Sequence, residues 1–74
     1  MNKYRRNGEL LEAVARRLRE LRAERGLSQA NVYIDTDINM ARVESGHTSI
    51  TLTTLSSLCD YYGVSLEEFF KGLV

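Results

Sequence analysis

The chain has 74 residues, of which 43% are apolar, and this is enough for one small folded domain rather than a disordered chain. The chain has a single cysteine, Cys59, which excludes an internal disulfide. Because it also has only one histidine, His47, a four-ligand zinc site made of Cys and His is excluded as well. No apolar run is long enough to span a membrane, and no signal-peptide pattern is present. We therefore expect a cytoplasmic protein with no metal, no cofactor and no membrane partner.

The formal net charge is zero, but the charge is distributed unevenly. Residues 1–26 carry eight Lys or Arg against four Asp or Glu, a net of +4, whereas residues 27–50 and 51–74 each carry one against three, a net of −2. Nucleic-acid binding depends on a local basic face rather than on the total charge. The asymmetry permits a nucleic-acid partner, and an ordinary solvated surface of mixed charge fits it equally well.

The N-terminal residues are polar and basic, and we expect residues 1–8 to form a flexible arm before one domain at residues 9–74. Such an arm can touch phosphates, although a frayed terminus is the more frequent form of such a segment. The first helix is expected from residue 8 or 9 to residue 25, because apolar residues recur there with the period of one buried helical face. They are Leu11, Val14, Leu18 and Leu21. Gly26 follows as a stop signal.

The next stretch, LSQANVYIDTDINMARVESG, predicts two short helices separated by a tight polar junction. Ser28 is expected to cap the first helix, and Thr36 the second, with Asp37 complementing the positive end of its dipole. The second helix should run over residues 37–44 and stop near Gly46. The core positions expected here are Val32 and Val43.

Two further helices complete the prediction. Thr51 should cap a helix at residues 52–62 that ends at Gly63, and Ser65 and Glu68 form a capping-box pattern that starts the last helix. The apolar face of the helix at residues 52–62 is made of Leu52, Leu55, Leu58 and Cys59. The expected fold is all-α, with five short helices around one core.

The order of three segments carries a family resemblance: RRLRELRAERGLSQ, then RVESG, then LTTLSSLCDYYGVSLEEFF. Over about residues 11–70 the chain resembles the lambda-repressor/Cro-type helix-turn-helix family, also called the xenobiotic-response-element family. The resemblance implies a DNA-binding domain with its helix-turn-helix at about residues 28–45. Between Gln29 and Glu44 the chain is shorter than the family spacing by nearly a helical turn, and the usual turn glycine is missing. Alignment backward from Glu44 places Thr36 at the start of the second helix, so the shortening is expected at the end of the first helix and in the turn.

The resemblance further implies that the helix at residues 37–44 enters the DNA major groove. Arg42 matches guanine O6 and N7, and Asn39 can pair with adenine N6 and N7. For both residues the alternative is the ordinary solvated polar face of a short helix. Asp37 is either a cap partner or a contact to a cytosine amine, and Ile38 either fills the core or touches a thymine methyl group. The candidate base contacts are Asp37, Ile38, Asn39 and Arg42.

Other candidate residues surround this helix. Phosphate contacts are expected at the start of the first motif helix and in the loop after the second; they are Ser28, Gln29, Ser45, His47 and Thr48. In the family, residues at the places of Arg22 and Glu44 form a salt bridge. The apolar chain end suggests a homodimer interface, with the alternative that these residues complete the monomer core; they are Phe69, Phe70, Leu73 and Val74.

The expected function is a sequence-specific, DNA-binding transcriptional regulator of the repressor type, acting on double-stranded DNA as a homodimer. An antitoxin-type or other module that binds a protein partner, such as a toxin or another regulator, is the alternative. The net −2 of residues 27–50 and the shortened turn favour it. An enzyme is not expected, because the sequence holds no paired-carboxylate, Ser/His/Asp or Cys/His arrangement and no phosphate-binding glycine loop.

Overall fold

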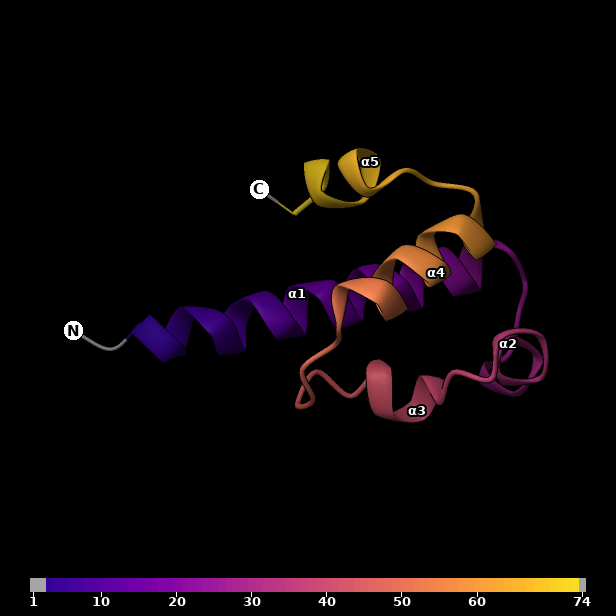
Figure 1. Ribbon diagram of the computed structural model, residues 1–74, viewed down its shortest axis with the longest axis horizontal. Coiled ribbons are helices and arrows are strands. Elements are labelled where there is room, and N and C mark those ends of the chain that lie inside the picture. Colours follow the sequence, from indigo (N-terminus) through magenta and orange to yellow (C-terminus); the bar gives the residue numbers. More distant parts are fainter. Residues whose placement is uncertain (1–2, 74) are drawn as a thin grey trace.

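The computed structural model describes residues 3–73, and within them the chain forms five helices and no strand. The helices are α1 (Lys3–Glu24), α2 (Gln29–Thr36), α3 (Met40–Val43), α4 (Leu52–Tyr62) and α5 (Leu66–Lys71). The long α1 lies along α4, with α5 on one side of the pair and α2 and α3 on the other (Figure 1). The predicted all-α fold is confirmed.

The core lies between α1 and α4 and receives side chains from all five helices. Its buried members are Val14, Leu18, Leu21, Val32, Met40, Leu55, Leu58, Cys59, Tyr62 and Phe69. Two predicted core positions differ from this pattern. Leu52 is the first residue of α4 and is 76% exposed; the buried face of α4 begins one turn later, at Leu55. Val43 is only partly buried, and Met40, which the sequence did not single out, is the fully buried residue of α3.

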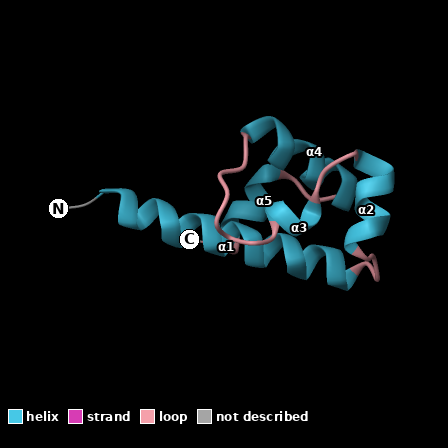
Figure 2. Cartoon of the chain, turned by 90° about the horizontal axis from the view of Figure 1, so that it is seen from below, coloured by secondary structure: helices cyan, strands magenta, loops and turns pink. Residues whose placement is uncertain are grey.

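The first helix begins earlier than expected. α1 starts at Lys3 rather than at residue 8 or 9, so the helix includes residues 3–8. Local chemistry allows this, because the segment has no proline and a glycine inside a helix, here Gly8, costs only about 1 kcal/mol. The N-terminal part of α1 projects beyond the other helices (Figures 1 and 2). The division of the chain at residue 8 stays a prediction.

The predicted caps of α2, α4 and α5 are present. The hydroxyl oxygens of Ser28, Thr51 and Ser65 each accept a hydrogen bond from the backbone N–H three residues later. The Glu68 carboxylate in turn accepts from the Ser65 backbone N–H at 3.0 Å, and hydrogen bonding from Ser65, chiefly this backbone bond, lowers the pKa of Glu68. Gly63 ends α4 with a left-handed φ of 77°. These helix ends follow from local hydrogen bonds alone.

The junction between α2 and α3 differs from the prediction. Thr36 is the last residue of α2 and does not cap α3; its hydroxyl donates to the Val32 carbonyl at 2.7 Å. Asp37 ends α2 in the left-handed region, with φ 63° and ψ 20°, and therefore stands where a turn glycine is usual. Asn39 is the cap of α3, which is only four residues long. α2 has eight residues, and α3 is shorter than the predicted helix at residues 37–44.

Candidate nucleic-acid interface

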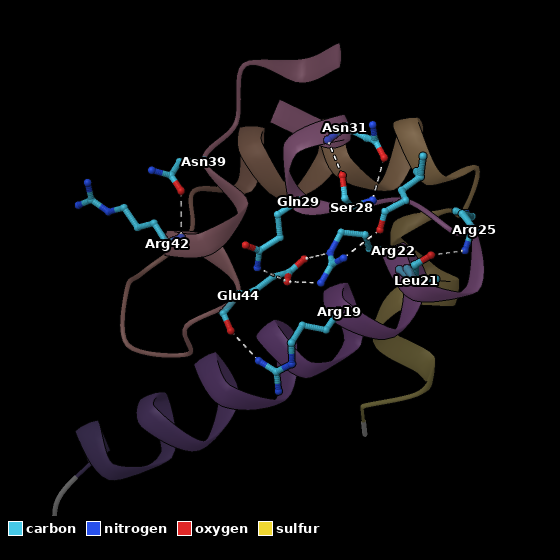
Figure 3. Close-up of polar contacts among 11 residues, drawn as sticks. Arg19, Leu21, Arg22, Arg25, Ser28, Gln29, Asn31, Asn39, Arg42 and Glu44 are labelled. Carbon is cyan, nitrogen blue, oxygen red and sulfur yellow. Dashed lines mark hydrogen bonds and ion pairs between the residues drawn. The ribbon is translucent and has the colours of Figure 1, made fainter. Parts of the chain in front are cut away.

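The end of α3 is tied to α1 by a buried carboxylate. Glu44 is 4% exposed, and its two oxygens accept from Arg22 Nε at 2.8 Å and Arg22 Nη2 at 3.0 Å (Figure 3). Hydrogen bonding to Glu44 raises the pKa of Arg22, so the guanidinium stays protonated. Arg22 Nη1 also donates to the Leu27 carbonyl at 2.9 Å, and an Arg19 N–H donates to the Glu44 carbonyl. The predicted ion pair is therefore present and is the centre of a network.

Gln29, a predicted phosphate contact, belongs to the same network. Its side-chain Nε2 donates to Glu44 Oε1 at 3.0 Å, so one of its two N–H groups is directed inward (Figure 3). This bond places the start of α2 beside the end of α3. Gln29 and Glu44 are thereby brought into contact, although they are 15 residues apart in sequence.

The remaining predicted phosphate contacts lie in the loop after α3. The Ser45 hydroxyl donates to the Arg42 carbonyl at 2.8 Å and accepts from the His47 N–H at 3.2 Å. The His47 side chain is exposed, and Thr48 is partly buried. No group of three His, Cys, Asp or Glu that could hold a metal ion occurs in the part of the chain that the structure describes. His47 is therefore a surface residue of this loop.

The four predicted base contacts fall into two pairs. Asn39 and Arg42 are exposed, and in Figure 3 the Asn39 amide nitrogen and the Arg42 guanidinium both extend away from Glu44. Among residues 3–73 the Arg42 side chain makes no hydrogen bond or ion pair. Ile38 is partly buried and packs against the core, in agreement with the core-filling alternative. Asp37 is exposed but is held by its role at the end of α2.

A hollow of about 330 Å³ opens between α2 and the start of α3. It is lined by Gln29, Ala30, Tyr33, Asn39, Met40 and Ala41. Sequence reasoning missed Ala30, Tyr33 and Ala41, because small and aromatic residues carry no binding motif. Helical register was the only signal that could have found them. It did not, because the predicted start of α3 is three residues too early. The hollow lies beside the exposed Asn39.

Two contacts fix the far ends of the supporting helices. The Tyr61 hydroxyl donates to the Asp35 carboxylate, which joins the end of α2 to α4 and raises the pKa of Tyr61. Arg25 Nε donates to the Tyr62 carbonyl at 2.8 Å and joins the end of α1 to the end of α4. The unit formed by α2 and α3 is thus held at several points, so the exposed side of α3 is presented by a fixed frame.

The predicted dimer residues do not form one exposed surface. Phe69 is fully buried in the core of the single chain and cannot contact a second copy, which corrects that part of the prediction. Phe70 and Leu73 are partly buried against the core, and Phe70 packs edge-on against Phe69 with ring centres 5.3 Å apart. Burial of Phe69 follows from the small size of the domain, in which α5 has to close one side. Val74 lies outside the described residues.

Two short helices, joined by a tight turn and clamped to a long supporting helix, define a helix-turn-helix domain. The chain matches the family described as "Helix-turn-helix domain" over residues 13–69, and it belongs to this family. Domains of this kind are binding modules rather than enzymes. The resemblance inferred from the sequence is therefore confirmed.

The chain is also similar to a curated protein, the HTH-type transcriptional regulator DdrOP3 of Deinococcus deserti. The two are 37% identical over 60 residues, which cover 77% of this chain and 46% of that protein. The chain thus spans about half the length of this relative. No solved structure gives a significant match. Within the described residues, no helix is both long enough and apolar enough to cross a membrane.

Proposed function

We propose that this protein is a sequence-specific, DNA-binding transcriptional regulator that acts as a repressor by inserting α3 into the major groove. The observation that carries the proposal is the division of α3 into two sides. On one side, Met40 and the residue that follows α3, Glu44, are buried and hold α3 against the rest of the domain. On the other side, Asn39, Ala41 and Arg42 are exposed. A helix that is anchored on one side and polar on the other suits the reading of base edges.

In this proposal Arg42 provides the principal base contact. Its guanidinium has a planar set of donors that matches O6 and N7 of guanine, and no internal partner has to be given up within the described residues. The phosphate strand on either side of α3 is contacted by polar groups from the start of α2 and the loop after α3. They are Ser28, the second side-chain N–H of Gln29, Ser45, His47 and Thr48. Asp37 stays at the edge of the interface, because a carboxylate is repelled by phosphates.

We further propose that the regulator binds as a two-fold dimer, so that two copies of α3 lie about 34 Å apart, one turn of DNA. Phe70 on α5 and Leu73, which follows α5, supply the apolar contacts between the two copies. Phe69 does not, because it is buried in the core of its own chain. Analytical ultracentrifugation of the free protein and of its DNA complex tests the stoichiometry. A single copy bound to a site without two-fold symmetry contradicts the dimer and leaves DNA binding intact.

Selection of bound duplexes from a random pool tests the proposal directly. We expect enrichment of a short two-fold symmetric sequence in which each half contains guanine. A dimer making about six phosphate contacts should also give a slope near −5 when log affinity is plotted against log salt concentration. No enrichment, together with no binding to duplex DNA at low salt, contradicts the proposal.

A protein-binding function is the second candidate, and exposed apolar side chains on α2 favour it. Tyr33 and Ile34 are 52% and 77% exposed, although apolar side chains of this size are more often buried. Residues 27–50 are also net negative, which weakens attraction to phosphates. Failure of the DNA selection, combined with a stable complex that is broken by Ile34→Asp, favours an antitoxin-type module over a DNA-reading one.

A further inference from the structure

We infer that Asn39 and the hollow between α2 and α3 together read thymine, with the base's O4 accepting from Asn39 and its 5-methyl group entering the hollow. The inference rests on the proposed function, because it requires α3 to lie in the major groove. It adds a second specific base to the guanine assigned to Arg42. It also replaces the adenine contact that the sequence alone suggested for Asn39.

The cap role of Asn39 determines what its side chain can offer to a base. Its Oδ1 accepts a hydrogen bond from the Arg42 N–H at 3.1 Å and is therefore directed toward the helix. The amide nitrogen points the other way, away from the body of the domain (Figure 3). A bidentate contact to adenine needs both a donor and an acceptor facing the base. Asn39 presents the donor alone, so it suits a base edge that offers an acceptor.

The lining of the hollow selects among the bases with an acceptor. Its lining is mixed: Gln29 and Asn39 are polar, whereas Ala30, Ala41, the ring of Tyr33 and the nearly fully buried Met40 supply an apolar part. In the major groove, guanine (N7 and O6) and adenine (N7) offer acceptors but no methyl group, whereas thymine places its 5-methyl group next to the O4 acceptor. A donor beside a hollow with apolar groups in its lining therefore matches thymine.

Base analogues can test the two contacts separately. In the duplex obtained by selection, each thymine is replaced in turn by deoxyuridine, which keeps O4 and lacks the methyl group. Loss of one buried methyl group corresponds to about a fourfold decrease in affinity, and we expect it at one position in each half-site. At that position, 5-methylcytosine paired with guanine keeps the methyl group but replaces the acceptor with a donor, and we expect a decrease of tenfold or more.

Protein variants link that position to the hollow. Ala41→Val and Ala30→Val each fill part of the hollow, so the ratio of affinities for thymine and deoxyuridine should fall from about four toward one. Ala23→Val is the matched control, because Ala23 is exposed on α1 and lies outside the lining. Asn39→Ser keeps an oxygen suited to capping but removes the amide donor, so thermal melting should change little while the penalty for 5-methylcytosine disappears.

The outcomes distinguish this inference from the function on which it rests. If duplexes are selected but deoxyuridine has no effect at any thymine, or if Ala41→Val leaves the ratio at its wild-type value, the thymine inference is wrong and DNA binding stands. If no duplex is selected, the proposed function fails and the inference fails with it. A site with the fourfold effect, abolished by Ala41→Val and kept by Ala23→Val, supports the inference.

Discussion

Glu44, at the end of α3, is joined to Arg22 on α1 by two hydrogen bonds of 2.8 and 3.0 Å, although the residues are 22 positions apart. The carboxylate also accepts from Gln29, so a single side chain connects the supporting helix with both helices of the motif. Because Glu44 is almost fully buried, its charge is tolerated only while these donors remain. The position of α3 and the stability of the domain therefore depend on the same group.

Glu44→Ala should destabilise the protein strongly, because it leaves the Arg22 guanidinium without its partner. Removal of one member of a buried pair costs about 3 kcal/mol, and DNA affinity should fall as well because the end of α3 is released. Urea denaturation and a binding titration measure the two effects. Glu20→Ala is the control, since Glu20 is exposed and lies 3.9 Å from Arg17, a pair expected to contribute less than about 1 kcal/mol. A Glu44→Ala protein that unfolds like the wild type would contradict this role.

Arg42→Ala should separate binding from folding. The side chain is exposed and its backbone N–H, which Asn39 caps, is unchanged by the substitution. The free energy of unfolding should stay within about 0.5 kcal/mol of the wild type, whereas affinity for the selected site should fall by roughly ten- to a hundredfold. Arg16→Ala, an exposed arginine on α1, serves as the control. Equal losses of affinity in both variants would mean that Arg42 contributes only charge.

Asp37→Gly should stabilise the protein. Asp37 adopts a left-handed conformation with φ 63°, which costs a residue with a side chain about 1–2 kcal/mol, whereas glycine adopts it without this cost but loses more chain entropy. The net gain should be about 0.5–1 kcal/mol in urea denaturation. Asp37→Asn tests the charge alone, because asparagine tolerates the same conformation. A glycine variant less stable than wild type would indicate that the carboxylate has a stabilising contact.

Tyr62→Phe should change how stability depends on pH. Burial and the nearby Glu44 raise the pKa of the Tyr62 hydroxyl from 10.0 to about 12. Between these values the unfolded chain has lost the proton and the folded chain retains it, so the free energy of unfolding decreases as pH rises from 10 to 12. The phenylalanine variant should show a smaller decrease over that range.

The same substitution should be neutral or favourable at pH 7. The buried Tyr62 hydroxyl has no hydrogen-bond partner among the described residues, and removing such a group can add up to about 1 kcal/mol to the free energy of unfolding. Thermal or urea denaturation of both proteins at pH 7, 10 and 12 measures both effects. A variant that is destabilised at pH 7 and keeps the wild-type pH profile would contradict them.

Local sequence was sufficient to predict most helix ends and much of the core. Ser28, Thr51 and Ser65 cap their helices through hydrogen bonds to a residue three positions away. Such bonds depend only on local geometry, so local sequence predicts them. The leucine spacing of α1 likewise predicted a buried face, because helical period alone places those side chains together. The family resemblance then supplied the pairing of Arg22 with Glu44.

The junction between α2 and α3 depends instead on contacts between helices that are distant in sequence. Thr36, Asp37 and Asn39 are all residues that can cap a helix or form a turn, so local preferences could not choose among them. The position of α3 is determined by burial of Met40 in the core and by the ion pair of Glu44 with Arg22. Because α3 then begins at Met40, Asn39 is the residue that caps it. The same placement sets Asn39 beside the hollow formed with α2. Contacts between helices far apart in sequence thus determined which side chains face outward from α3.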